Sequence, residues 1–268
     1  MSGAASVLDR IVATTREQLV LRRATLPLER LQSLAPTPTP HRSFVAALCR
    51  PARVNVIAEF KRRSPSRGVI REDLAPARVA EAYQRAGAVA LSVLTEPAFF
   101  GGSLEDLREA RRASALAVLR KDFVVDPYQV WEAAYAGADA LLLIVAALTD
   151  EELRTLLASA AEAHIDTLVE VHDAIELRRA LAAGARLVGV NNRDLRSMQV
   201  RLETCLELAP LLPAGVLAVA ESGIKSGGDL RRLSDAGYRA CLVGEQLMQA
   251  PDPGAALREL IHAAGPRE

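Results

Sequence analysis

Short apolar runs, rich in leucine and β-branched residues, recur at regular intervals along the chain. They are too short to be helices and have no polar face, which is typical of strands buried on both faces of a parallel sheet. Eight strands are predicted, at residues 54–59, 88–94, 117–121, 139–145, 167–171, 187–191, 216–221 and 240–244.

Between these strands the apolar residues change to the spacing of an amphipathic helix. Eight helices are predicted, at residues 75–86, 104–113, 127–136, 150–163, 174–183, 202–208, 227–236 and 254–264. Several of them reach a glycine just before the next strand, as in RAGAVAL and YAGADAL. A glycine at this point suits the left-handed residue that ends a helix.

Eight alternating strand–helix units predict an α/β fold, a closed (β/α)8 TIM barrel. An open doubly wound sheet is the less favoured alternative, because no GxGxxG follows the first strand. Before the barrel, residues 5–24 are predicted as a helix, residues 35–40 (APTPTP) as an extended linker and residues 44–48 as a second helix. We expect residues 1–268 to form a single barrel domain, with residues 1–50 as a helical cap packed over one end.

Composition narrows the classes of function. Half of the 268 residues are apolar, and 33 basic residues balance 33 acidic ones, so bulk charge predicts neither a nucleic-acid partner nor a membrane surface. The three cysteines, Cys49, Cys205 and Cys241, are far apart and have no histidines at metal spacing, which argues against disulfides and against zinc. With no signal-peptide pattern and no apolar stretch long enough to span a bilayer, we expect a cytoplasmic protein.

The lysines are more informative. Only three of the 33 basic residues are lysine, namely Lys61, Lys121 and Lys225. A guanidinium holds its proton too tightly for acid–base chemistry, whereas an ammonium can give its proton up. In a chain that otherwise uses arginine, a lysine at a strand end is therefore a candidate for proton transfer.

Polar residues lie at the ends of four odd-numbered strands: Glu59, Lys121, Glu170 and Glu221. The C-terminal ends of barrel strands meet at one mouth, and alternate strands supply one layer of inward side chains. We therefore expect three carboxylates around one lysine, with Lys61 and Asn191 close by. Grouped charges of this kind separate the pKa values of acids and bases. Strand ends can also be solvated loop starts, or buried ion pairs that only close a barrel.

A phosphate site is predicted at the same end of the barrel. ESGIKSGGD follows the seventh strand and LVGEQLM the eighth, where barrels commonly bind phosphate, so Gly223 and Gly244 could bring backbone N–H groups close to an anion. The loop RRSPSRG after the first strand supplies Ser64, Ser66 and Arg67. An ordinary turn at each glycine is the alternative.

Seven segments in order, from about residue 9 to 248, carry a family resemblance: IAEFKRRSPSRG, LSVLTEPAFFGGSLEDL, LRKDFVVDPYQVWEA, GADALLLIVAAL, LVEVHD, GVNNRDL and AESGI. Together they resemble indole-3-glycerol-phosphate synthase of tryptophan biosynthesis. The resemblance implies a carboxy-lyase that closes, decarboxylates and dehydrates 1-(2-carboxyphenylamino)-1-deoxyribulose 5-phosphate, giving indole-3-glycerol phosphate. It implies a small phosphorylated substrate and no cofactor or metal.

The resemblance also implies roles for residues at the mouth. Lys121 would be the general acid, Glu59 and Glu170 would orient its ammonium, and Glu170 would be the base that receives a proton as aromaticity returns. Lys61 would bind the substrate carboxylate or act as acid in the dehydration, and which lysine serves which step stays open. The expected catalytic set is Lys121, Glu170, Lys61, Glu59, Asn191 and Glu221.

Further positions carry over as binding residues. Those for the sugar chain and the aromatic ring are Arg193, Ser222, Leu94, Phe123 and Leu142. Those for the phosphate are Gly223, Gly244, Glu245 and Ser64. Glu245 departs from a serine found in several family members, and since a carboxylate repels phosphate, we expect its side chain to point away. Phe60 replaces a more usual isoleucine and should affect packing only outside the barrel.

Two alternatives remain open. A different phosphate-binding barrel enzyme, such as phosphoribosylanthranilate isomerase, would be expected to use a cysteine and an aspartate, and no cysteine ends a strand at this mouth. A barrel that only binds a partner would be expected to have lost Lys61, Lys121 or Glu170. We expect a monomer without nucleic-acid or membrane partners, and weak contact with other enzymes of tryptophan biosynthesis is left open.

Overall fold

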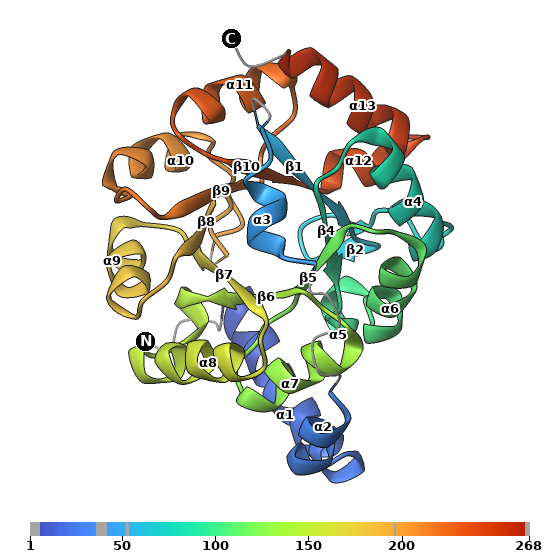
Figure 1. Cartoon of the computed structure of the whole chain (residues 1–268), viewed down its shortest axis with the longest axis vertical. Coiled ribbons are helices and arrows are strands. Elements are labelled where there is room, and N and C mark those ends of the chain that lie inside the picture. The colour runs from blue at the N-terminus through green and yellow to red at the C-terminus, as the bar shows by residue number, and fades with distance from the viewer. Residues whose placement is uncertain (1–5, 36–41, 52–53, 196, 266–268) are drawn as a thin grey trace.

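The computed structural model describes residues 6–35, 42–51, 54–195 and 197–265. Their core is a closed barrel of parallel strands in the order β1-β10-β9-β8-β7-β6-β5-β4, surrounded by helices (Figure 1). The barrel strands are β1 (Asn55–Phe60), β4 (Ala90–Leu94), β5 (Ala117–Lys121), β6 (Ala140–Ile144), β7 (Asp166–Val171), β8 (Leu187–Asn191), β9 (Leu217–Glu221) and β10 (Ala240–Val243). The predicted TIM barrel is confirmed, and the ends of its strands differ from the prediction by at most two residues.

The uninterrupted apolar runs follow from burial on both faces of each strand. All six residues of β1 are buried. Ile57 belongs to an apolar cluster inside the barrel, whereas Val56, Ala58 and Phe60 belong to the cluster between the strands and the helices. The prediction that Phe60 packs outside the barrel is therefore confirmed.

The predicted helices are present between the strands. They are α4 (Pro76–Ala86), α6 (Leu104–Ala113), α7 (Pro127–Ala136), α8 (Asp150–Glu162), α9 (Ala174–Ala182), α10 (Glu203–Leu208), α11 (Gly227–Asp235) and α13 (Pro253–Ala264). Gly87 ends α4 at φ 97° and Gly137 ends α7 at φ 85°, in the left-handed conformation that glycine adopts most easily.

Several short elements were not predicted. After β1 the chain forms an antiparallel hairpin of β2 (Arg63–Ser64) and β3 (Gly68–Val69). The helices α5 (Pro97–Phe100) and α12 (Glu245–Gln249) follow β4 and β10, and the 3-10 turns η1 (Val145–Ala147) and η2 (Ala209–Leu211) follow β6 and α10. A helix of three to five residues is too short to show a clear helical period, and the two-residue strands β2 and β3 contain no apolar run.

In the described part of the N-terminal region, three helices precede the barrel: α1 (Val7–Thr25), α2 (Leu28–Leu34) and α3 (Phe44–Leu48). The first and third were predicted and the second was not. Residue 5 and nearly all of the expected linker lie outside the described residues. None of the described helices is long and apolar enough to cross a membrane.

These helices contact the barrel at more than the one end that was expected. Figure 1 shows α3 within the ring of strands, and Asn55 at the start of β1 donates a side-chain hydrogen bond of 2.8 Å to the carbonyl of Leu48. The other two helices lie beside α7 and α8 instead (Figure 1), where Arg22 pairs with Glu132 at 2.9 Å. Leu8 and Ile11 of α1 belong to the apolar cluster inside the barrel, and α1 contacts η1 after β6, so α1 as well as α3 packs against an end of the barrel.

A buried arginine connects the strands to this N-terminal region. Arg120 on β5 has no exposed side-chain surface, and it donates to Asp122 and to Glu132, each at 2.8 Å. The carboxylate of Glu132 also binds Arg22 of α1. Burial raises the pKa of Asp122, but Arg120 and the Thr95 hydroxyl outweigh it and hold that pKa below its usual value. The network therefore consists of charged groups.

Candidate active site

A cavity of about 890 Å3 lies at the C-terminal ends of the barrel strands. Every residue predicted for the site contributes to its wall. The predicted catalytic residues in the wall are Glu59, Lys61, Lys121, Glu170, Asn191 and Glu221. The predicted binding residues in the wall are Ser64, Leu94, Phe123, Leu142, Arg193, Ser222, Gly223, Gly244 and Glu245. The topology thus brings together side chains that lie far apart in the sequence.

Lys121 forms the centre of the charged group. Its Nζ lies 3.1 Å from Oε2 of Glu170 and 3.4 Å from Oε2 of Glu221. Burial lowers the pKa of Lys121, but these two carboxylates and Glu59 raise it well above its usual value. The side chain is therefore an ammonium, poised to donate a proton to an oxygen that gains negative charge.

The second lysine, Lys61, pairs with a carboxylate of the first strand. Lys61 Nζ lies 2.9 Å from Oε1 of Glu59, and both side chains are largely buried. The Ser92 hydroxyl donates to the other oxygen of Glu59 at 3.3 Å. Lys61 and Lys121 thus each lie next to a carboxylate in the cavity, and the third lysine, Lys225, lies in the cavity wall as an exposed residue.

Glu170 and Glu221 contact the same lysine but differ in their affinity for a proton. Burial raises the pKa of Glu170, yet Lys121, His172 and Asn191 bring it below the usual value. At Glu221 burial outweighs the attraction of Lys121, and the neighbouring Glu170 charge adds to it, so the pKa rises to about 8. At neutral pH Glu170 is thus the carboxylate that can accept a proton, and Glu221 carries one.

Two glycines leave space for these carboxylates. A Cβ at Gly189 of β8 would lie 2.1 Å from Oε1 of Glu221, and one at Gly244 would lie 2.5 Å from Oε1 of Glu59. Gly189 was missed by the sequence analysis, although a glycine inside a strand often marks such a close approach. Gly244 was predicted for a phosphate, and the structure adds a second reason for a glycine there.

The loop after β9 has an unusual backbone. Ser222 has φ 64° and Gly223 has φ 77°, both in the left-handed region. Serine adopts this conformation rarely, and such strain concentrates at functional sites. The Asn192 side chain donates to the carbonyl of Ser222 at 3.0 Å, which stabilises the turn.

Apolar side chains form one wall of the cavity. Leu94, Phe123 and Leu142 are buried and lie there together, as predicted for an aromatic slot. Phe100 of α5 also lines the cavity, with its ring centroid 5.9 Å from that of Phe123. Phe100 was missed because its helix was missed.

Glu245 lies in the cavity wall, and its carboxylate is held by two ion pairs. Its Oε1 accepts from Arg67 Nε at 2.9 Å, and its Oε2 lies 3.3 Å from an Nη of Arg193. The two arginines come from the loops after β1 and β8. The carboxylate is thus neutralised by groups that could otherwise bind an anion.

Metal binding and a cysteine nucleophile are two other kinds of chemistry that a barrel mouth can carry. Among the residues that the structure describes, no group of three or more His, Cys, Asp or Glu could hold a metal ion. The described wall of the large cavity contains no cysteine, and Cys205 and Cys241 are buried elsewhere. Its chemistry is that of lysines, carboxylates and an amide.

Comparison with known proteins relates the chain to one family. The indole-3-glycerol phosphate synthase family matches residues 8–260. The chain belongs to this family. A synthase of that name from Acidithiobacillus ferrooxidans is 49% identical over 258 residues, covering 95% of this chain and 98% of the relative. One from Carboxydothermus hydrogenoformans is 45% identical over 261 residues, covering 95% and 99%. The predicted resemblance to the synthase family is confirmed.

Solved structures of other proteins share the barrel. A 3-hexulose-6-phosphate synthase aligns with a TM-score of 0.62 at 16% identity, over 78% of this chain and 99% of the other. Mandelate oxidase with benzoyl-formic acid aligns with a TM-score of 0.59 at 19% identity, over 90% and 88%. At this identity the likeness concerns the fold alone.

Proposed function

We propose that the large cavity carries out the synthase reaction, with Lys121 as general acid and Glu170 as general base. The substrate is 1-(2-carboxyphenylamino)-1-deoxyribulose 5-phosphate, and the products are indole-3-glycerol phosphate, CO2 and water. The observation that carries the assignment is the Lys121 ammonium within 3.4 Å of two buried carboxylates whose proton affinities differ.

Ring closure comes first. The aryl carbon that bears the carboxylate attacks the ketone carbon, and the anilinic nitrogen lone pair supports the developing cation. The electrons of the C=O bond move to oxygen, which takes a proton from Lys121. Glu59 and Glu170 stabilise the cationic nitrogen. Glu170 and Glu221, rather than the expected Glu59, hold the Lys121 ammonium in place, because Glu59 pairs with Lys61. The cavity contributes by keeping the flexible sugar chain folded over the ring.

Loss of CO2 and of water follows. The C–C bond to the carboxylate breaks, and its electrons return to the ring while CO2 leaves. The hydroxyl then leaves as water after protonation by a lysine, and the carbon next to nitrogen loses a proton to Glu170. Lys61 is the second lysine in reach of this chemistry, and the assignment of each lysine to a step stays open.

Binding residues are proposed along the same wall. Leu94, Phe123 and Leu142 would hold the aromatic ring, and Arg193, Asn191 and Ser222 the sugar chain. The phosphate would lie at Gly223 and Gly244, with Ser64 on the opposite loop. The fixed ion pairs of Glu245 leave only its backbone N–H for the phosphate.

A fluorescence assay tests the function. The purified protein is incubated with the carboxyphenylamino substrate, and the indole product is followed by its emission. Turnover is expected between about pH 5 and 9, where lysine and glutamate act as acid and base. No product at any pH in this range would defeat the proposal, and formation of the substrate from phosphoribosylanthranilate would favour the isomerase alternative.

Location and partners are part of the proposal. We expect a monomer in the cytoplasm that takes one small phosphorylated substrate and needs neither nucleic acid nor a membrane. Weak contact with other enzymes of tryptophan biosynthesis is left open. Sedimentation of the purified protein would test the monomer, since a dimer would have about twice the expected mass.

A further inference from the structure

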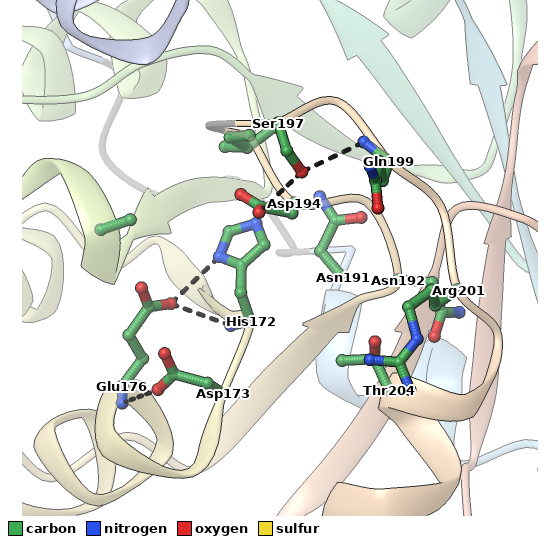
Figure 2. A pocket seen from close by; sticks show the side chains of 12 residues that line it. His172, Asp173, Glu176, Asn191, Asn192, Asp194, Ser197, Gln199, Arg201 and Thr204 are labelled. Atoms are coloured by element: carbon green, nitrogen blue, oxygen red, sulfur yellow. Dashed lines mark hydrogen bonds and ion pairs between the residues drawn. The ribbon is translucent and has the colours of Figure 1, made fainter. Parts of the chain in front are cut away.

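A second cavity, of about 320 Å3, adjoins the first and shares Asn191 and Leu195 with it. Figure 2 shows this second cavity with His172 in its wall. His172 directly follows β7 and comes two residues after Glu170, the proposed base. His172 thus lies at the boundary between the reacting groups and this polar space.

Both ring nitrogens of His172 face carboxylates. Nδ1 lies 3.0 Å from Oε2 of Glu176 in the first turn of α9, and the same oxygen accepts the backbone N–H of His172 at 2.8 Å (Figure 2). Nε2 lies 3.5 Å from Oε1 of Glu170. Neither of these last two atoms has a hydrogen-bond partner among the described residues, and both are buried.

The proton on the ring decides whether this contact is favourable. The Glu176 carboxylate accepts only, so Nδ1 carries a hydrogen. In a neutral ring Nε2 would then present a lone pair to an ionised oxygen of Glu170, and two acceptors would face each other. A second proton on Nε2 turns this repulsion into a charge-assisted hydrogen bond.

The surrounding charges favour the imidazolium. The acidic groups around the ring are Glu170 and Glu221 from the barrel, Glu176 from α9, and Asp173 and Asp194 in the cavity wall. The basic groups are Lys121, which pairs with Glu170, and Arg201 in the cavity wall, which pairs with Glu207. Burial lowers the pKa of His172, but the hydrogen bond that its side chain donates to Glu176 and the charge of Glu170 outweigh burial and raise that pKa.

We propose that His172 is a positioning residue for the reaction: as an imidazolium held by Glu176, it donates from Nε2 to Oε1 of Glu170. The other oxygen of Glu170 faces Lys121 at 3.1 Å. The carboxylate is then fixed from two sides and kept ionised, which is the state needed to accept a proton from the substrate. This inference rests on the proposed role of Glu170 as the base.

A purely structural role for His172 makes different predictions. In that case the ring would only tie the end of β7 to the start of α9 through Glu176. Its protonation would not depend on Glu170, and a neutral side chain of similar size would support catalysis equally well. The two roles are separated by the titration of the ring and by the kinetics of His172→Gln.

NMR titration tests the proposal without any assay of turnover. The protein has four histidines, and the signal of His172 is identified by its absence in His172→Gln. We expect His172 to titrate above the ordinary histidine value of about 6.5. Its pKa should fall by about one unit or more in Glu170→Gln and in Glu176→Gln. Titration at or below 6.5, or no change in Glu170→Gln, overturns the proposal.

Kinetics supply the second readout. In His172→Gln we expect kcat to fall about 10- to 100-fold with KM within about threefold, because a misplaced base slows the reaction more than it weakens binding. The wild-type loss of kcat as pH rises through the pKa of His172 should be absent in the variant. The proposal is overturned if kcat of His172→Gln equals that of the wild type. It is also overturned if kcat of the variant still falls at alkaline pH, because that fall would then come from Glu221.

Controls separate the possible failures. His262→Gln, on the exposed face of α13, should keep both kcat and the pH profile. If His172→Gln does not fold, as judged by its melting curve, the titration in the two glutamate variants decides alone. If the wild type itself does not turn over the substrate, the proposed function fails, while the titration still answers whether His172 is charged by Glu170.

Discussion

Glu170 and Glu221 are almost completely buried and share one lysine, yet one loses its proton easily and the other keeps it. The difference comes from the surroundings of each side chain. Glu170 has His172 and Asn191 next to it in addition to Lys121, whereas Glu221 has only the lysine to offset its burial and the neighbouring charge. A single residue type can thus supply a base and a proton-bearing acid at the same mouth.

Glu221→Gln tests this difference through stability. The folded pKa of about 8 lies above the ordinary value of 4.5, so the protonated side chain contributes stability that is complete below pH 4.5 and is lost as pH rises through 8. Glutamine mimics the protonated form at every pH. We expect the Tm of the variant relative to wild type to rise by about 4 °C or more between pH 5 and pH 9. A difference in Tm that is the same at both pH values contradicts this.

Gly189→Ala tests whether the position of Glu221 matters. The added Cβ would lie 2.1 Å from Oε1 of Glu221, so the carboxylate must move. We expect kcat to fall at least about tenfold, with a stability loss of about 1–3 kcal/mol from overpacking. Gly228→Ala is the control, because its nearest atom would be at an ordinary 3.4 Å. Equal activity of the two variants would show that Glu221 can shift without consequence.

At the scale of elements, three loops meet through one side chain. Glu245, at the start of α12, binds Arg67 from the loop after β1 and Arg193 from the loop after β8. The carboxylate cancels part of the positive charge that a phosphate would meet. It therefore opposes the anion while it holds both arginines in place.

Glu245→Gln measures which of these effects is larger. With the negative charge removed, we expect KM for the phosphorylated substrate to fall about two- to tenfold at low ionic strength. The change should shrink above about 0.5 M salt, where charges several ångströms apart are screened. Steady-state kinetics at two salt concentrations give the answer. A rise in KM would mean that holding the arginines matters more than the repulsion.

The sequence predicted the long elements better than the short ones. The eight strands stood out as uninterrupted apolar runs and the eight helices by their hydrophobic period, and the bounds of both were close to those observed. The hairpin β2–β3 was missed because its strands contain no apolar run, and the helices α5 and α12 because four or five residues give little helical period. Since Phe100 and the ion pairs of Glu245 depend on these elements, the sequence could not place them.

Residues of the site were predictable where their chemistry was unusual for their position. Lys121 stood out as one of three lysines, and Glu59 and Glu221 as charges at the end of apolar runs. The space that Gly189 leaves for Glu221 depends on distances across the barrel, and so do the contacts of His172 with Glu170 and Glu176. Such distances follow from strand register and side-chain packing, which cannot be predicted from the hydrophobic pattern of a single sequence.

At the scale of the whole molecule, the N-terminal region is tied to the barrel by buried charge. Arg120 of β5 and Arg22 of α1 share the carboxylate of Glu132, and Arg120 also binds Asp122. The helix before the barrel thus depends on a group that lies on the outer face of a strand. Loss of Arg120 would leave two carboxylates without their main partner.

Arg120→Met tests this dependence. Removing one partner of a buried ion pair typically costs about 3–5 kcal/mol, which corresponds to a fall in Tm of roughly 6–20 °C for a domain of this size. Arg85→Met, which breaks an exposed pair with Glu81, should change Tm by no more than about 2 °C. Thermal melting of the two variants provides the comparison. A fall no larger than that of Arg85→Met would mean that the network adds nothing.

The central step of the proposed reaction is the donation of a proton by Lys121 inside the barrel mouth. The most direct measurement is the turnover of Lys121→Arg, which keeps the positive charge but cannot release a proton at neutral pH. We expect kcat to fall by at least about 100-fold, the usual contribution of a general acid, with KM changed little. Lys225→Arg changes an exposed lysine in the wall of the same cavity and should stay within about twofold of wild type. Near-normal turnover of Lys121→Arg would contradict the account.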